Sequence, residues 1–226
     1  MMLPSNSNSY YFYPEYHWFF IHFIWLGINN VMNQLSKGQK LQEAYRQYIE
    51  PYSCYLQYAV TLTLKQSALI RVKRFQNYGS DIYEFREYLD DDKLRSTIRF
   101  FTTQFTNELY GNKSKHKNKQ QWASPLVIAA VEGRNTHKLT HLHLAIGNIP
   151  ATHTENIAQH IQVAFQRCDF ANKQLCVKTV TNSSGWLGYI TKEVGYTDND
   201  ALNIVDSTIP PFIQHSICTE GRLLAW

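Results

Sequence analysis

The chain has 226 residues, of which 44% are hydrophobic and 18% charged, and its formal net charge is +4 at pH 7. This composition excludes an intrinsically disordered protein, which has fewer apolar residues and a higher net charge, and the length allows one domain with an extension. We predict an N-terminal aromatic and helical extension over residues 1–50 and one folded domain over residues 51–226.

Residues 10–28 form an aromatic and apolar run that Pro14, Glu15, His17 and His22 interrupt. The run lacks the basic lead and the small-residue cleavage site of a secretion signal, and its interruptions argue against a membrane span. Because Met32 follows and begins a more conventional sequence, residues 1–31 are compatible with a packing extension, an interfacial anchor or an upstream misread start. We predict no membrane partner.

The cysteine pattern indicates the redox compartment. No pair of cysteines has C-x-x-C spacing, and no cleavable signal sequence precedes them. Because structural disulfides belong mainly to secreted proteins, this pattern predicts reduced thiols and a cytoplasmic location. The cysteines are Cys54, Cys168, Cys176 and Cys218.

The first half of the chain predicts two helices and one strand. Residues 35–49 carry apolar and aromatic residues at helical spacing and end before Pro51, which indicates an amphipathic helix. Residues 55–65 are rich in apolar and β-branched residues, which predicts a buried strand with its threonines on one side. The acidic residues 90–92 favour a helix start, and apolar residues three to four positions apart continue that helix to Leu109.

The second half predicts three strands and two helices. Residues 125–132 and 139–146 are apolar runs joined by a hairpin-type connection. A helix over 154–168 and a strand over 175–180 follow, and a cap cluster at 182–185 precedes a short helix from about Trp186 to Val194. The order β-α-β-β-α-β-α predicts an α+β fold, with an antiparallel central sheet of four to five strands and flanking helices packed largely on one face.

His141 and His143 lie two residues apart in the predicted 139–146 strand, so both imidazoles share one face while Leu142 and Leu144 point into the core. Glu132 ends the preceding strand, and a hairpin closed in near-symmetric register places its carboxylate beside the histidines. This donor set suits Mg²⁺ or Mn²⁺, the imidazoles favour Mn²⁺, and zinc is also compatible. An ordinary solvated sheet face is the alternative.

Tyr189 and Lys192 lie three residues apart on the predicted short helix, so both can approach one phosphate. A tyrosine phenol ionises near pH ~10 in water, so attack at neutral pH needs a metal or a base that stabilises the developing charge. A metal held by the histidines could supply that Lewis acidity, and Lys192 could orient or neutralise the phosphate. The alternative is a packing tyrosine with a solvated lysine beside it.

Three motifs, taken in order, resemble those of the HUH endonucleases, specifically the single-tyrosine replication initiator (Rep) proteins of rolling-circle replicons. The motifs are Thr61-Leu62-Thr63-Leu64, His141-Leu142-His143 and Tyr189-x-x-Lys192. They lie on a predicted strand, strand and helix, and the match spans roughly residues 55–194. The resemblance implies that residues 51–226 form an HUH endonuclease domain with an RRM-like palm.

The resemblance implies an enzyme that binds single-stranded or hairpin origin DNA, nicks one strand and stays attached through a 5′-phosphotyrosine. Such an enzyme initiates rolling-circle replication of a plasmid, a phage or a mobile element. In that family the first motif is structural or contacts DNA. The resemblance further implies that Glu132, His141 and His143 hold the divalent ion, that Tyr189 is the nucleophile and that Lys192 assists.

Several observations qualify the resemblance. The chain has no G-x-x-x-x-G-K-[ST] phosphate loop, so we expect a host helicase to unwind the origin. Tyr196 resembles the second tyrosine of two-tyrosine enzymes only loosely, because we expect Gly195 to end the helix.

Other functions are also compatible with these elements. A single-tyrosine transposase or relaxase would use the same motifs. A non-catalytic RNA-recognition module has the same element order, although residues 139–146 offer no paired aromatics, and a two-histidine phosphoesterase would need a second paired element.

Basic residues cluster in two places and predict salt-dependent contacts with the DNA backbone. Simple solubility is the alternative explanation for the lysine-rich stretch. The two clusters are Arg71, Lys73 and Arg74, and Lys113, Lys115, Lys117 and Lys119.

Overall fold

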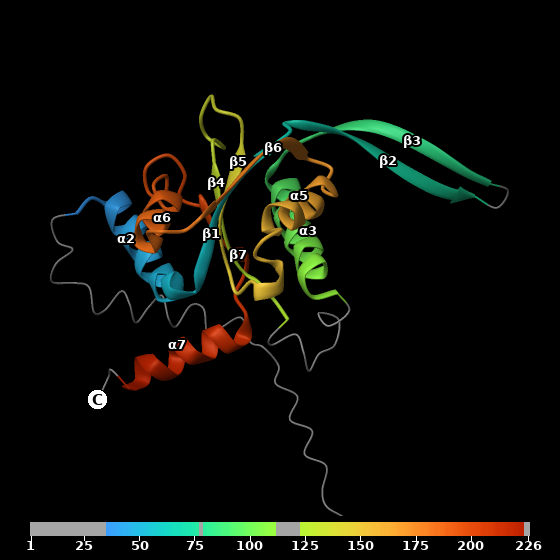
Figure 1. Cartoon of the computed structure of the whole chain (residues 1–226). Helices are drawn as coiled ribbons and strands as arrows, with labels where there is room; N and C mark the ends of the chain where they lie inside the picture. The colour runs from blue at the N-terminus through green and yellow to red at the C-terminus, as the bar shows by residue number, and fades with distance from the viewer. Residues whose placement is uncertain (1–34, 77–78, 112–122, 224–226) are drawn as a thin grey trace, which may run out of the picture.

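A computed structural model describes residues 35–76, 79–111 and 123–223 of the chain. The fold is α+β, with a five-stranded antiparallel sheet in the order β6-β1-β5-β4-β7 and helices on its flanks (Figure 1). The predicted fold class is therefore confirmed. The strands are β1 (Leu56–Leu64), β4 (Leu126–Glu132), β5 (His141–Gly147), β6 (Ala171–Thr179) and β7 (Leu202–Thr208).

Side-chain caps begin three of the helices, and those of α3 and α6 lie where the sequence predicts a helix start. Ser36 and Gln39 form a reciprocal capping box at α2, Asp90 accepts a hydrogen bond from the Lys93 amide at α3, and Asn182 accepts one from the Gly185 amide at α6. The α-helices are α2 (Lys37–Ile49), α3 (Asp91–Tyr110), α5 (Ile157–Gln166), α6 (Ser183–Ile190) and α7 (Pro211–Leu223). The 3₁₀ helices are η2 (Glu50–Tyr55) and η4 (Ala151–His153).

Helices cover both faces of the sheet, so the prediction of helices largely on one face is wrong. Helices α3 and α5 pack on one face, and α2 and α6 lie on the other (Figure 1). The reason is visible in β4, which is buried at all seven positions and so presents apolar side chains in both directions. In β5, Leu142 and Leu144 point toward α3 and α5, as predicted, and Ala145 points toward α6.

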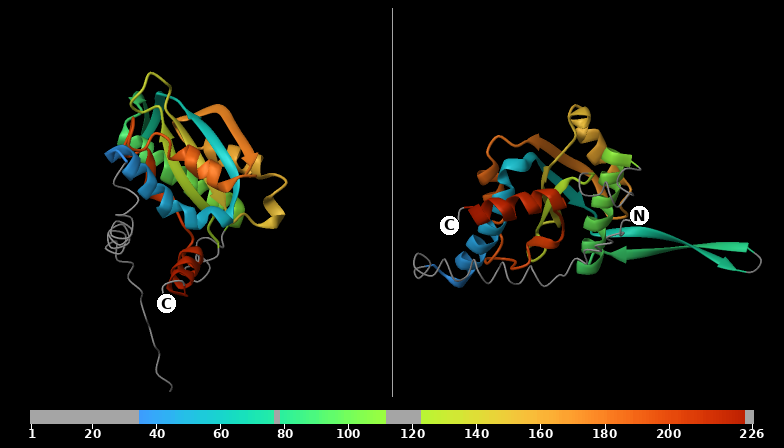
Figure 2. Two further views of the ribbon diagram at one scale, coloured as in Figure 1. Left: turned by 90° about the vertical axis from the view of Figure 1, so that its left-hand side faces the viewer. Right: turned by 90° about the horizontal axis from the view of Figure 1, so that it is seen from below.

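A long hairpin that the hydrophobic pattern does not predict projects from the body of the protein (Figures 1 and 2). Strands β2 (Ser67–Gln76) and β3 (Gly79–Tyr88) pair with each other in a separate two-stranded sheet. Charged residues interrupt both strands, which obscures their alternation. The exposed Arg71 forms an ion pair with Glu84 across this hairpin. Strand β7 and helix α7 are likewise additions to the predicted element order.

Two predictions concern residues that lie outside the described ranges. Both residues 1–34 and the lysine-rich stretch 113–119 fall there, and the division of the chain at residue 50 stays a prediction. Helix α2 itself meets the turn after α6, where a Cβ atom on Gly38 would lie 1.9 Å from the Gly195 carbonyl oxygen. Within the described ranges, no helix combines the length and the apolar character that a membrane crossing requires.

Candidate active site

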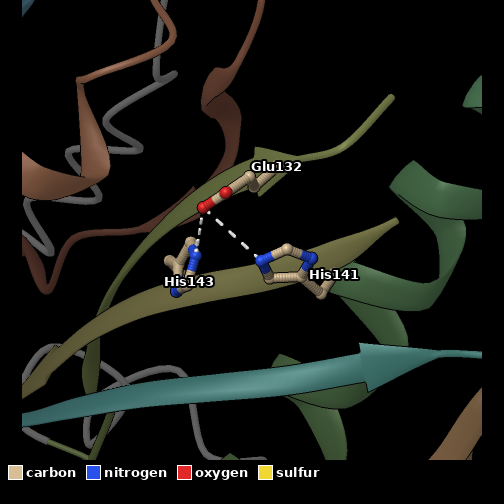
Figure 3. A group of neighbouring side chains, drawn as sticks. All are labelled: Glu132, His141 and His143. Carbon is tan, nitrogen blue, oxygen red and sulfur yellow. Dashed lines mark hydrogen bonds and ion pairs between the residues drawn. The ribbon is translucent and has the colours of Figure 1, made fainter. Parts of the chain in front are cut away.

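The β4–β5 hairpin brings Glu132, His141 and His143 together (Figure 3). They lie on the sheet face that α6 covers, because Trp186 and Tyr189 of α6 contact His143. Glu132 is paired directly with His141 across the two strands, which confirms the predicted register. One metal-ligating atom from each of the three side chains lies within 4.8 Å of those of the other two. These three residues could therefore hold one metal ion.

His141 is held in the tautomer that leaves its outer nitrogen free to bind a metal. Its Nδ1 lies 2.9 Å from the carbonyl oxygen of Leu139, and a carbonyl only accepts, so Nδ1 carries the hydrogen. The other nitrogen, Nε2, then presents a lone pair to the Glu132 carboxylate, 3.4 Å from Oε2. In this tautomer, Nε2 can bind a metal ion that Oε2 of Glu132 also binds.

His143 is almost fully buried and is fixed at both nitrogens. Its Nε2 lies 2.7 Å from Glu132 Oε2, and its Nδ1 lies 3.0 Å from the Thr61 hydroxyl on β1. A hydroxyl can donate or accept, so Thr61 can support either tautomer of the ring. Burial, despite the hydrogen bond to Glu132, lowers the pKa of His143 to about 4, which leaves the ring neutral at pH 7 as metal binding requires.

Glu132 is a buried carboxylate surrounded by cations. Lys138 Nζ lies 3.1 Å from Oε1, and Lys192 Nζ lies 2.5 Å from Oε2. Burial by itself would raise the pKa of Glu132, but hydrogen bonds from Lys192, Lys138 and His143 outweigh it and lower the pKa to about 2. Glu132 is therefore an anion at neutral pH, and it can serve as a ligand.

Helix α6 presents Tyr189 to this group. The Tyr189 ring centroid is 4.9 Å from that of His143, and 41% of the Tyr189 surface is exposed. Trp186 stacks on Tyr189 with centroids 5.1 Å apart, and its indole N–H donates to the Leu144 carbonyl at 3.3 Å. The Tyr189 ring therefore lies against His143, as the predicted convergence of phenol and imidazoles requires.

Lys192 also reaches the site, but from a different element than predicted. Helix α6 ends at Ile190 rather than near Val194, and Lys192 lies in the turn that follows. Its amide donates to the Tyr189 carbonyl at 3.2 Å, and its Nζ lies 3.7 Å from the centre of the Tyr189 ring. Tyr196 lies further along the same turns and is 61% exposed.

The residues present fit a divalent ion. The donor set is two imidazole nitrogens and one carboxylate, His143 is neutral, and each Nδ1 has a partner that fixes the orientation of its ring. Ligands about 2.1 Å from one ion lie roughly 3.0–3.4 Å apart. His141 Nε2 and Glu132 Oε2 have this separation, at 3.4 Å, whereas His143 Nε2 lies closer to the same oxygen, at 2.7 Å, as a hydrogen-bonded pair does.

Three further residues contribute to the site, and of these only Thr61 belongs to a motif identified in the sequence. Thr61 orients His143, Trp186 packs on Tyr189, and Lys138 binds the second oxygen of Glu132. The three-residue spacing of Trp186 and Tyr189 on one helix was a usable signal. The Thr61 contact depends on which strands are neighbours, and local sequence does not determine that.

Comparison with protein-family models, with curated proteins and with solved structures finds no match to this chain.

Proposed function

We propose that this protein is a metal-dependent, site-specific DNA nickase and strand transferase of the HUH type. It would cut single-stranded or hairpin origin DNA through a 5′-phosphotyrosine and initiate rolling-circle replication of a plasmid, a phage or a mobile element. One observation carries the proposal: the partly exposed Tyr189 ring lies against His143, which forms a group with His141 and the buried carboxylate of Glu132.

The proposed reaction is a transesterification. The Tyr189 oxygen attacks the scissile phosphorus, a tyrosine–phosphorus bond forms, and the bond from phosphorus to the 3′ oxygen breaks. The phenol loses its proton and the departing 3′ oxygen gains one. The reverse attack by a 3′ hydroxyl rejoins a strand and frees the tyrosine. Because the phosphodiester is exchanged rather than hydrolysed, neither step needs a nucleoside triphosphate.

The residues around Tyr189 have distinct roles in this proposal. A divalent ion bound by Glu132, His141 and His143 would supply Lewis acidity at the scissile phosphate. Mn²⁺ or Mg²⁺ would suit this mixed nitrogen and oxygen set. The Lys192 ammonium, 3.7 Å from the centre of the Tyr189 ring, would stabilise the developing negative charge. Trp186 would hold the phenol ring in place through the stack.

The partners of the proposed reaction follow from its chemistry and from the sequence. Origin DNA would bind through basic residues, so binding should weaken as salt concentration rises. The chain has no phosphate-loop motif, so strand separation would require a host helicase.

Replacement of Tyr189 by Phe tests the proposal. Single-stranded oligonucleotides that tile the replicon carrying the gene, labelled at the 3′ end, would be incubated with protein and MnCl₂ and run on a denaturing gel. The wild type should give a labelled protein band, because the tyrosine retains the downstream fragment. Tyr189→Phe should lose this band entirely while still binding the DNA.

Tyr196→Phe is the matched control, because it removes a phenol from the turns that follow α6. It should form the adduct like the wild type. An adduct of normal yield with Tyr189→Phe would refute the assignment of the nucleophile. Binding by the wild type without any nicking in Mn²⁺ would instead favour a non-catalytic nucleic-acid-binding module.

A further inference from the structure

Two ammonium groups occupy the carboxylate that the proposed metal site needs. Lys192 Nζ contacts Glu132 Oε2 at 2.5 Å, and Lys138 Nζ contacts Oε1 at 3.1 Å. The two lysines are not equivalent, because Oε2 is also the oxygen that faces His141 and His143, at 3.4 and 2.7 Å. Lys192 therefore shares the oxygen around which the three candidate ligands gather.

A divalent ion and the Lys192 ammonium cannot both use this oxygen without strong repulsion. The carboxylate is only 6% exposed, so water screens little of the interaction there. An ion bound to Oε2 and the two imidazoles would lie within a few ångströms of an ammonium that now contacts the same atom. Lys138 contacts the other oxygen, and 64% of its side chain is exposed, so solvent weakens its effect.

The Lys192 side chain can move away from Glu132. It lies in the turn beyond α6 rather than within the helix, and its side chain is 35% exposed. Its Nζ already lies 3.7 Å from the centre of the Tyr189 ring. A rotation of this long side chain can move Nζ away from Glu132 and leave it beside the phenol, without a change in the backbone.

We infer that Lys192 is a displaceable counter-ion, which neutralises Glu132 while no metal is bound and is released toward Tyr189 when a divalent ion binds. The inference rests on the proposed function, because it assumes a metal at Glu132, His141 and His143. It adds that metal binding frees the ammonium, which already lies beside the Tyr189 ring, from its ion pair with Glu132, so that its charge acts on the nucleophile alone. Loading of the metal and preparation of Tyr189 would then be one coupled event.

Coupling of this kind is reciprocal: if the metal displaces Lys192 from Glu132, then the Lys192 charge weakens metal binding. Removal of that charge should therefore tighten the binding of Mn²⁺, although the same change impairs nicking. A lysine that served only to position phosphate, away from Glu132, would leave metal affinity nearly unchanged. A lysine that served only to support the fold of the site would weaken metal binding when it is replaced.

The test measures Mn²⁺ binding to the full-length protein without DNA, by calorimetry and by the electron paramagnetic resonance signal of free Mn²⁺. Lys192→Met removes the charge and keeps most of the length of the side chain, and it should bind Mn²⁺ about tenfold more tightly than the wild type. Lys192→Arg keeps the charge and should stay within about threefold of the wild type. Lys138→Met should tighten binding less than Lys192→Met does, because Lys138 is more exposed.

The outcomes separate this inference from the proposed function. Mn²⁺ affinity that is equal or weaker in Lys192→Met, while the wild type binds the ion, overturns the displacement of Lys192 and leaves the metal site standing. Binding by Lys192→Met alone supports the inference in its strongest form. Failure of every form to bind Mn²⁺ overturns the metal site, and with it both proposals. Thermal unfolding of each variant shows whether it is folded.

Discussion

Two buried carboxylates on the outer half of the sheet have different surroundings. Asp206 on β7 and Glu132 on β4 are both only 5% exposed, and each lies between two cationic side chains. Asp206 accepts hydrogen bonds from Arg95 at 3.0 Å and from Arg99, and these residues tie β7 to α3. Glu132 has Lys138 and Lys192 as its cations, and it also faces two imidazoles.

The difference shows what distinguishes a structural carboxylate from a candidate ligand. The guanidinium groups beside Asp206 stay charged at all relevant pH values and offer rigid donors, so both oxygens are satisfied. At Glu132 the cations are flexible ammonium groups, and one neighbouring imidazole presents a bare nitrogen. A buried carboxylate can exchange its partner for a metal when its neighbours are themselves ligands or displaceable cations.

The largest expected effect is on metal binding, which neutralisation of Glu132 should weaken and neutralisation of Asp206 should not. Glu132→Gln should reduce Mn²⁺ affinity at least ~100-fold, because an anionic ligand is lost. Its free energy of unfolding should also fall, by about 1–3 kcal/mol at pH 7, because Lys138, Lys192 and His143 lose an anionic hydrogen-bond partner.

Asp206→Asn is the matched control for the same comparison. It should cost about 1–3 kcal/mol in urea unfolding, because two charge-assisted hydrogen bonds are lost, and it should leave Mn²⁺ affinity as in the wild type. Loss of metal binding in Asp206→Asn but not in Glu132→Gln would reverse the two assignments.

The next largest effect is expected on the free energy of unfolding at low pH. Burial opposes ionisation of Asp206, but hydrogen bonds from Asn203, Arg99 and Arg95 prevail and lower its pKa, and the pKa of Glu132 falls from 4.5 to about 2. A carboxylate whose pKa is lower in the folded state stabilises the fold above its unfolded-state pKa, and this stabilisation is lost as pH falls through the folded-state value. The free energy of unfolding of the metal-free protein should therefore decrease from about pH 5 toward pH 2.

Urea unfolding at a series of pH values checks this expectation. Asp206→Asn and Glu132→Gln should each show a shallower decrease in acid than the wild type. If both variants follow the wild-type curve below pH ~4, the two carboxylates are not held as anions in the folded protein.

The smallest expected effect concerns the partner of His143. Thr61→Val keeps the shape of the side chain but removes the hydroxyl that lies 3.0 Å from Nδ1. Loss of such a supporting hydrogen bond should weaken Mn²⁺ binding about tenfold. Thr61→Ser retains the hydroxyl and should stay close to the wild type. Equal Mn²⁺ affinity in Thr61→Val and Thr61→Ser would mean that Thr61 does not orient the ligand.

Much of the sheet and of the site could be predicted from short-range patterns. Alternation in residues 139–146 separates the histidines from Leu142 and Leu144, and a short connection determines the hairpin register that brings in Glu132. These features depend on neighbours in one strand or one turn. Local sequence is therefore enough to predict the faces of this strand and the register of the hairpin.

The remaining features depend on contacts between distant segments or on mixed patterns. Strand β7 is an edge strand that carries Asn203 and Asp206, so its apolar alternation is diluted. The β2–β3 hairpin mixes charged and apolar residues on its strands, and the end of α6 at Ile190 moves Lys192 from a helix face into a turn. The pairing of β1 with both β5 and β6, which brings in Thr61, is a property of the whole sheet.

The central claim is that the Tyr189 oxygen forms the covalent bond to DNA beside the Glu132, His141 and His143 group. Mass spectrometry of the DNA-linked peptide, isolated after reaction with single-stranded origin DNA in Mn²⁺, tests this claim most directly. We predict a nucleotide attached through phosphate to Tyr189. A nucleotide on Tyr196 or on any other residue would contradict the claim, as would cleavage of the strand with no covalent peptide at any stage of the reaction.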